Sequence, residues 1–202
     1  YRPLRERDVE ELKESARAML KNSGHEEISL SSLSSSDYTH LEELVNFLID
    51  EFKSAGVNIS LPSLRIDAFA LDVMSKVQDI KKSSLTFAPE AGTQRLRDVI
   101  NKNLTEEEIL HGCQGAFAAG RTNVKLYFML GLPTETDEDI IGIPTLGGKV
   151  VDEYYHTPGR PKGKSVDVTI SCSCFVPKAH TPFQWFGQDS YEELVRKQKL
   201  LG

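Results

Sequence analysis

The sequence predicts an α/β protein in which the strands of a parallel sheet alternate with outer helices. Expected strands begin near residues 27, 57, 84, 124 and 166, a spacing of roughly one strand–helix unit per 30–40 residues. In the clearest unit the apolar run from Val124 to Leu130 is followed by Gly131 and Pro133, and then by an acidic helix start at Thr136. Because ligands of parallel α/β proteins bind at the carboxyl ends of the strands, the turn at Gly131 lies where a site is expected.

The first half of the chain is predicted to alternate between helices and strands. A helix opens at Asp8, where Glu11 three residues later resembles a capping box, and it ends at Gly24. A second helix over 41–52 carries one apolar face and ends at Gly56. The other expected elements of this half are strands over 27–33 and 57–61, a continuation of the second strand over 64–66, and a helix over 70–77.

The second half continues this alternation. The helix after Thr136 is expected to be interrupted, because Pro144 and the pair Gly147 and Gly148 disfavour the interior of a helix. The other expected elements are a strand over 84–88 with an exit turn at 89–92, a short helix near 96–100, a helix opened by the capping box of Thr105 and Glu108 and reaching 119, strands over 124–130 and 166–175, a basic loop over 157–164, and a final helix from Asp189 or Ser190.

Composition limits the class of protein. With 202 residues, 39% apolar and 27% charged, the chain can form one domain with its own core. Its formal charge of −6 argues against a general nucleic-acid-binding surface. The sequence has no apolar run near the roughly 18–20 residues of a membrane span and no signal peptide. Three cysteines, an odd number, suggest reduced thiols and a cytoplasmic location.

Polar groups at the expected strand exits are candidates for chemistry. Glu90 lies between a buried strand and Gly92, where a carboxylate can bind a hydroxyl pair, hold a metal ion, act as a base, or interact with the positive end of the next helix. Glu135 lies in a helix-start sequence, where Glu is expected on structural grounds. Arg65 and Asp67 alternate along an extended segment, so they share one side of it and can pair with each other.

The cysteines Cys113, Cys172 and Cys174 are interpreted as small buried residues. Cys172 and Cys174 should point to one face of a strand, whereas zinc and iron–sulfur sites usually draw such pairs from loops with further ligands nearby. The five histidines form no close pair at ligand spacing, and neither a G-x-S-x-G elbow nor a P-loop occurs. We therefore expect no metal-ligand set within this chain.

Several of these stretches together resemble the strand exits of radical S-adenosylmethionine (radical SAM) enzymes. VKLYFMLGLPTETDEDI is similar to the fifth-strand motif of the family, an apolar strand ending in Gly-x-Pro-x-Glu-Thr, and SLTFAPEAGTQRLRDVINKNLTEEEI resembles the fourth strand. EISLSSLSSSDY resembles the second strand, whose exit contacts the methionine part of the cofactor. CSCFVPKAHTPFQW resembles the sixth strand of a subgroup, the uncharacterised radical SAM proteins with a cobalamin-binding-like amino-terminal domain.

This resemblance implies a fold, a cofactor and a set of binding residues. The fold is a partial (β/α)6 TIM-like barrel with a parallel sheet and outer helices. The cofactor is S-adenosylmethionine, whose ribose hydroxyls would meet Glu90, whose carboxylate would meet Lys102, and whose adenine would meet the backbone near Gly131. The complete set of cofactor-binding residues that we expect is Ser34, Ser35, Ser36, Arg65, Asp67, Glu90, Lys102, Leu130, Gly131, Val176 and Pro177.

The chain departs from the family because it lacks the defining motif, Cys-x3-Cys-x2-Cys after the first strand. Those cysteines hold a [4Fe–4S] cluster, and in the family a segment like residues 1–5 follows soon after them. We therefore expect the cluster loop and the first barrel strand to lie upstream of Tyr1, so that residues 1–202 are a single partial-barrel domain and a fragment of a longer protein.

The resemblance also implies an activity for the longer protein. It would cleave S-adenosylmethionine reductively to methionine and a 5′-deoxyadenosyl radical, with methyl or methylthio transfer as the expected use. Cobalamin bound by an upstream domain of the same chain is a further expectation. The fragment alone is expected to be inactive, because it has no cluster ligands. Its substrate is not predicted, because substrate contacts come from variable loops and added domains.

Two other classes of protein fit the same residues. One is an ordinary TIM-barrel lyase or hydrolase that uses Glu90, Lys125 and Asp67, although Lys125 lies near the start of its strand and so far from the strand exits. The other is a non-catalytic binding module that has lost the cluster motif. A Cys-x3-Cys-x2-Cys sequence upstream of Tyr1 would distinguish the radical enzyme from both.

Overall fold

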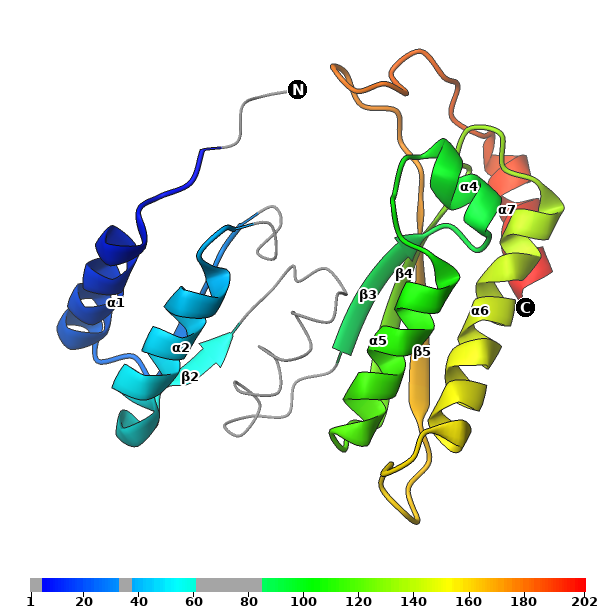
Figure 1. Cartoon of the computed structure of the whole chain (residues 1–202). Helices are drawn as coiled ribbons and strands as arrows, with labels where there is room; N and C mark the ends of the chain where they lie inside the picture. Colours follow the sequence, from blue (N-terminus) through cyan, green and yellow to red (C-terminus); the bar gives the residue numbers. More distant parts are fainter. Residues whose placement is uncertain (1–4, 33–37, 61–84) are drawn as a thin grey trace. The chain divides into compact units, whose positions relative to one another are not determined.

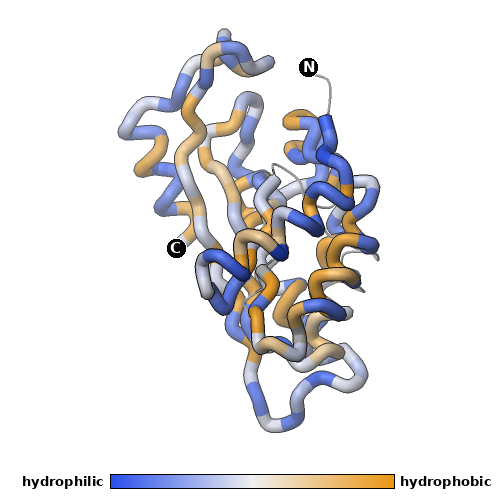
Figure 2. The backbone as a smooth tube through the Cα atoms, turned by 90° about the vertical axis from the view of Figure 1, so that its left-hand side faces the viewer, coloured by the Kyte–Doolittle hydropathy of each residue, from blue (hydrophilic) through white to orange (hydrophobic). Residues whose placement is uncertain are grey.

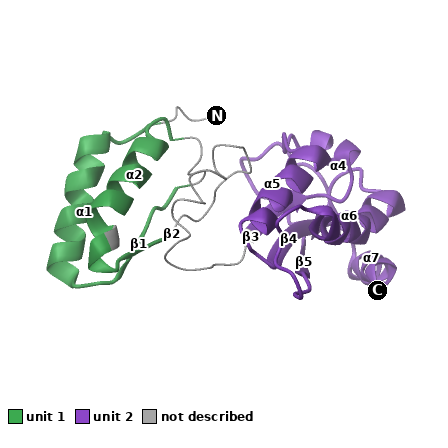
Figure 3. Ribbon diagram, turned by 60° about the horizontal axis from the view of Figure 1, so that its bottom comes forward, with its two compact units in different colours: residues 1–83 green, residues 84–202 purple. Residues whose placement is uncertain are grey.

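The structure is a computed structural model that describes residues 5–32, 38–60 and 85–202 (Figure 1). It divides the chain into two compact units, residues 1–83 and residues 84–202 (Figure 3). Each unit pairs parallel strands with helices. The α/β class and the parallel strands predicted from the sequence are therefore confirmed.

The first unit contains two helices and one pair of parallel strands. Ile28 lies opposite Ile59 in this pair. The first strand is shorter than the predicted 27–33, since residues 30–32 are described but not in a strand. The residues expected to extend the second strand, 61 and 64–66, lie outside the described part of the chain. The elements are α1 (Val9–Ser23), β1 (Glu27–Ser29), α2 (Leu41–Phe52), the 3-10 turn η2 (Lys53–Ala55) and β2 (Asn58–Ser60).

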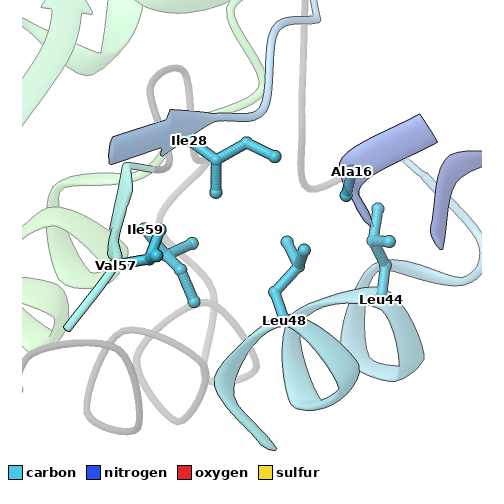
Figure 4. Close-up of a cluster of buried hydrophobic side chains, with 6 residues drawn as sticks. All are labelled: Ala16, Ile28, Leu44, Leu48, Val57 and Ile59. Atoms are coloured by element: carbon cyan, nitrogen blue, oxygen red, sulfur yellow. The ribbon is translucent and has the colours of Figure 1, made fainter. Parts of the chain in front are cut away.

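The ends of α1 are formed by the residues predicted to form them. The Asp8 side chain accepts hydrogen bonds from the backbone N–H groups of Glu10 and Glu11, at 2.9 and 3.2 Å. Gly24 ends the helix with a φ of +67°, a conformation that glycine adopts without steric cost. The buried core of the unit joins both helices to both strands, as Figure 4 shows, and consists of Ala16, Ile28, Leu44, Leu48, Val57 and Ile59.

The second unit is a three-stranded parallel sheet in the order β3-β4-β5, with helices α5 and α6 side by side on one face (Figure 1). Leu126 lies opposite Phe87 on one side and Ile170 on the other. The elements are β3 (Leu85–Glu90), α4 (Gln94–Val99), α5 (Glu106–Ala118), β4 (Asn123–Leu130), α6 (Asp137–His156), β5 (Asp167–Cys174) and α7 (Tyr191–Leu201).

Strand β4 is the centre of this unit and alternates strictly between its two faces. Val124, Leu126, Phe128 and Leu130 are buried, whereas Tyr127 on the other face is 38% exposed. Along the helices, hydrophobic and hydrophilic segments also alternate, as the orange and blue stretches in Figure 2 show. Alternation of this kind is expected when each element turns one side toward a core.

Helix α6 differs from its prediction, because it runs unbroken from Asp137 to His156 through Pro144. Gly147 explains part of the difference: a Cβ atom there would lie 2.8 Å from the Ile170 side chain, so the glycine lets the helix approach β5 closely. Apolar side chains at helical spacing are buried along the same face, from Ile140 to Tyr154. The expected interruption was therefore wrong, because packing against the sheet outweighs the weak helix propensity of these residues.

In the part of the chain that the structure describes, no helix is long and apolar enough to cross a membrane.

Candidate cofactor-binding site at the strand ends

The carboxyl ends of β3, β4 and β5 meet at one edge of the second unit. The backbone N–H of Phe175, just after β5, donates to the carbonyl of Leu130 at the end of β4, at 2.8 Å. The segments that follow the three strands each contribute at least one residue to an apolar cluster at this edge. Its buried residues are Ala91, Leu96, Leu132 and Phe175. The three exits are thus held together as one surface, as predicted for a parallel sheet.

Two of the expected binding residues, Glu90 and Lys102, form an ion pair that the sequence did not predict. Glu90 is the last residue of β3, and its Oε1 lies 3.3 Å from the Nζ of Lys102. Both side chains are partly exposed, so the carboxylate can be reached by a ligand. The alternative role of Glu90 at a helix start is taken by another residue, since the Thr93 hydroxyl accepts the N–H of Leu96 and caps α4.

Three residues at the strand exits have a left-handed backbone although they are not glycine. They are Glu90, with a φ of +67°, Thr134, with a φ of +67°, and His180, with a φ of +62°. Glu90 ends β3, Thr134 follows β4, and His180 follows β5. Such conformations cost free energy, of order 1–3 kcal/mol each, and cluster at ligand-binding sites. Their placement at all three exits supports a binding role for this edge.

A buried carboxylate, Asp139, ties the β3 exit to the β4 exit. It accepts hydrogen bonds from the Thr93 hydroxyl and the Arg95 guanidinium of the first exit, and from the N–H and hydroxyl of Thr136, at 2.8 and 2.9 Å. Burial alone would raise the pKa of Asp139, but these hydrogen bonds outweigh it and lower the pKa below its ordinary value. Arg95 also donates to the Thr134 carbonyl at 2.9 Å.

A second buried network lies under the β4 exit turn. Glu135 Oε2 accepts both the N–H of Gly131 and the ammonium of Lys197, each at 2.8 Å, and Lys197 also donates to Asp189 Oδ2 at 2.6 Å. The Glu135 side chain is only 2% exposed. Glu135 is therefore more than the helix-start residue that its local sequence indicates, because it joins the turn to α7.

Gly131 has a φ of +83°, which favours glycine on backbone grounds alone. A Cβ atom there would also lie 3.0 Å from Asp189 Oδ2 and 3.4 Å from the Leu194 side chain. The clearance at Gly131 is therefore taken up by the segment leading into α7 and by α7 itself, and the turn geometry accounts for the glycine. A nucleoside would meet the backbone of this turn and not a space left by the missing side chain.

Changing Gly131→Ala is expected to destabilise the second unit by about 1 kcal/mol or more, because alanine is strained at positive φ and crowds Asp189. Urea unfolding of the natural protein, followed by hydrogen exchange of the β4 amides, measures the loss. The control is Gly163→Ala, because Gly163 also has a positive φ, +75°, but an added Cβ atom there would have no other atom within 4 Å. A smaller loss at position 131 than at 163 would contradict the crowding.

The remaining expected residues fall in three places. Val176 and Pro177 directly follow Phe175 at the β5 exit, and Val176 is 52% exposed. Five others lie outside the described residues, so their placement stays a prediction: Ser34, Ser35, Ser36, Arg65 and Asp67. At the end of β1, the described residues Ser31 and Ser32 line a cavity of about 400 Å³ within the first unit.

The prediction that the cysteines are buried is confirmed for Cys113 and wrong for Cys172 and Cys174. Cys113 is fully buried in α5, where burial first and then the nearby Glu153 carboxylate raise the pKa of its thiol. Cys172 and Cys174, however, are exposed on β5, so their interpretation as buried residues was wrong. They lie opposite Phe128 and Leu130 in the register of β4 and β5.

Within residues 5–32, 38–60 and 85–202, no group of three or more His, Cys, Asp and Glu side chains could hold a metal ion. The described cysteines do not fit a [4Fe–4S] cluster, because one is buried in α5 and the other two lie on a strand.

Sequence reasoning missed several residues that build this edge. Asp139 had a local signal, the Thr136-x-x-Asp139 spacing of a capping box, which the structure contains. Arg97 is fully buried and donates to the carbonyls of Ala91 and Leu104, at 3.0 Å each, so it fixes the segment between β3 and α5. Lys197 gave no local signal, because its partner Glu135 lies 62 residues earlier.

In α/β proteins with a parallel sheet of this kind, ligands bind at the carboxyl ends of the strands, which is the edge described above. A family model described as the Radical SAM superfamily matches residues 1–144. Uncharacterized protein MJ0966 of Methanocaldococcus jannaschii is 39% identical over 184 residues, which make up 91% of this chain and 37% of that protein. The chain thus belongs to the radical SAM superfamily, and it spans little more than a third of the length of this relative.

Proposed function

We propose that the chain is the S-adenosylmethionine-binding core of a radical SAM enzyme. Superfamily membership supports an enzyme that uses this cofactor. The observation that carries the proposal is the Glu90 carboxylate, held at the end of β3 in a left-handed conformation beside Lys102. A carboxylate presented in this way can accept two vicinal hydroxyls, the group that a ribose offers.

The proposed roles follow from the chemistry of each group. Glu90 binds the ribose, and the Lys102 ammonium, 3.3 Å from Glu90 Oε1, orients its carboxylate. The backbone of Leu130 and Gly131 and the exposed edge of Val176 and Pro177 pack against adenine. Ser34, Ser35 and Ser36 keep the role at the methionine end that the family resemblance implies. Arg65 and Asp67 remain expected cofactor-binding residues with no assigned part of the cofactor.

When bound and given an electron, S-adenosylmethionine supplies radical chemistry that no side chain can perform. The part of this protein is to bind the nucleoside, orient it and exclude water. Because the described cysteines do not fit a cluster, we place the ligands of the [4Fe–4S] cluster in a part of the protein outside this chain.

Several finer proposals keep what the sequence and the family resemblance imply. They are a six-stranded partial barrel formed by residues 1–202 as one domain together with an upstream first strand, a cytoplasmic location, methyl or methylthio transfer as the reaction, and a cobalamin-binding domain elsewhere in the same protein. The alternative lyase or hydrolase has less support, since Lys125 lies near the start of β4 with its ammonium 4.8 Å from the centre of the Tyr127 ring.

Glu90→Gln is expected to weaken nucleoside binding by about tenfold or more, because hydrogen bonds to a charged group contribute about 1.5–3 kcal/mol each. Isothermal titration calorimetry of the natural protein with S-adenosylhomocysteine, an unreactive analogue, measures this affinity. The matched control is Glu107→Gln, on the exposed side of α5, which should bind as the wild type does. Equal affinities of wild type and Glu90→Gln would reject Glu90 as the ribose ligand.

A further inference from the structure

The turn after β4 is connected through Glu135 to helix α7, which comes much later in the sequence. Lys197 belongs to α7, and its ammonium reaches Glu135 at 2.8 Å and Asp189 at 2.6 Å. The same Glu135 oxygen accepts the N–H of Gly131. A chain of three groups therefore runs from α7 through Glu135 to the backbone of the turn.

The burial of these groups shows that the contact is tight. The side chains of Lys197 and Glu135 are 7% and 2% exposed, so water cannot replace either partner without opening the structure. Burial alone would lower the pKa of Lys197, but hydrogen bonds to Asp189 and Glu135 outweigh it and raise the pKa above its ordinary value. The ammonium is thus kept charged between two carboxylates.

Helix α7 is also fixed in place independently of Lys197. Ser190 caps its first turn by accepting the N–H of Glu193, and Arg196 forms two hydrogen bonds to Asp137 at the start of α6, at 3.0 and 2.7 Å. Leu194 lies against Gly131, as the 3.4 Å distance to an added Cβ shows. Because α7 is anchored in this way, the Lys197 side chain that it carries can hold Glu135 in one position.

We propose that Lys197 is a positioning residue for nucleoside binding: through Glu135 it fixes the Gly131 turn against which adenine packs. This inference rests on the proposed function, and it adds α7 to the parts of the chain that shape the site. Lys197 itself does not contact the cofactor. Without its ammonium, Glu135 would turn toward water, release the Gly131 N–H and leave the turn free to move.

The test compares Lys197→Met, Lys197→Arg and the control Lys199→Met, which removes an exposed cation of the same helix. All are measured in the natural protein at a temperature where each is folded, as circular dichroism verifies. Two quantities are followed: the affinity for S-adenosylhomocysteine by calorimetry, and the exchange rate of the Gly131 amide relative to the Phe128 amide within β4.

We expect Lys197→Met to weaken binding at least tenfold and to speed exchange at Gly131 at least tenfold, with Phe128 unchanged. Lys197→Arg should recover most of both losses, and Lys199→Met should bind like the wild type. A lower melting temperature with unchanged affinity of the folded protein would mean that Lys197 only stabilises the fold, and would overturn the proposal.

A double variant tests the relay through Glu135. If Lys197 acts through Glu135, then Glu135→Ala with Lys197→Met should bind no more weakly than the weaker of the two single variants. Additive losses would overturn the relay. Binding by the wild type distinguishes this inference from the proposed function on which it rests. If the wild type does not bind S-adenosylhomocysteine, the proposed function is rejected. If the wild type and Lys197→Met both bind it normally, only the role of Lys197 is rejected.

Discussion

Replacing Asp139 by alanine is expected to destabilise the second unit by about 2–4 kcal/mol, because hydrogen bonds to a charged group contribute about 1.5–3 kcal/mol each, while the half-exposed Arg95 can be rehydrated. The reason is that one carboxylate, 2% exposed, accepts four hydrogen bonds from three residues. Its removal leaves the hydroxyl of Thr93 and the N–H of Thr136 without their acceptor. It also removes a negative charge from the first turn of α6, where the helix dipole favours one.

The loss can be measured in the natural protein by hydrogen exchange of the central β4 amides, which report the opening of this unit and not of the whole protein. Asp152→Ala, on the exposed side of the same helix, is the control and should change stability by less than about 0.5 kcal/mol. Asp139→Asn should fall between the two, because the amide keeps the size but loses the charge. A loss below about 1 kcal/mol for Asp139→Ala would show that the network contributes little.

The elements that sequence reasoning placed well are those set by local patterns. The apolar run of β4, the acidic start of α6 after Thr136, and the capping box of Thr105 and Glu108 are each determined by residues a few positions apart. The continuity of α6 was missed because it depends on a contact far along the chain, the fit of Gly147 against Ile170. Helix propensity alone indicates a break there.

The site follows the same division. The family resemblance named both Glu90 and Lys102 as binding residues, but their contact across twelve residues was seen only in the structure. Lys197 was not predictable, because nothing in a lysine on a polar helix indicates that it will be buried against Glu135. The exposure of Cys172 and Cys174 depends on which helices cover β5, a property of the packing and not of the strand sequence.

The junction between the β3 exit and α6 is also a contact that only the packing reveals. A Cβ atom on Gly92 would lie 2.3 Å from the carbonyl oxygen of Asp139, 2.4 Å from the nitrogen of Ile143 and 2.6 Å from the carbonyl carbon of Gly142. All three atoms belong to the backbone of α6, which cannot rotate away as a side chain can. Gly92 is therefore required by the close approach of two backbones.

Gly92→Ala is accordingly expected to cost about 3 kcal/mol, the upper end of the usual range for overpacking. To accommodate the methyl group, the β3 exit must move off α6, and this movement pulls Thr93 and Arg95 away from Asp139. Those β4 amides that exchange only when the unit opens should exchange about a hundredfold faster, since each 1.4 kcal/mol of lost stability raises the population of the open state about tenfold. The Glu90 carboxylate moves with the exit, so nucleoside affinity should fall as well.

Gly148→Ala provides the matched control, because it is the same substitution in α6 at a position with nothing within 4 Å. Alanine is the better helix former, so this variant should be more stable than the wild type by about 0.5–1 kcal/mol. The two variants thus differ in sign for one physical reason: the added methyl group meets backbone at position 92 and open space at position 148. If both variants destabilised the unit equally, the close packing of the β3 exit on α6 would not be present in solution.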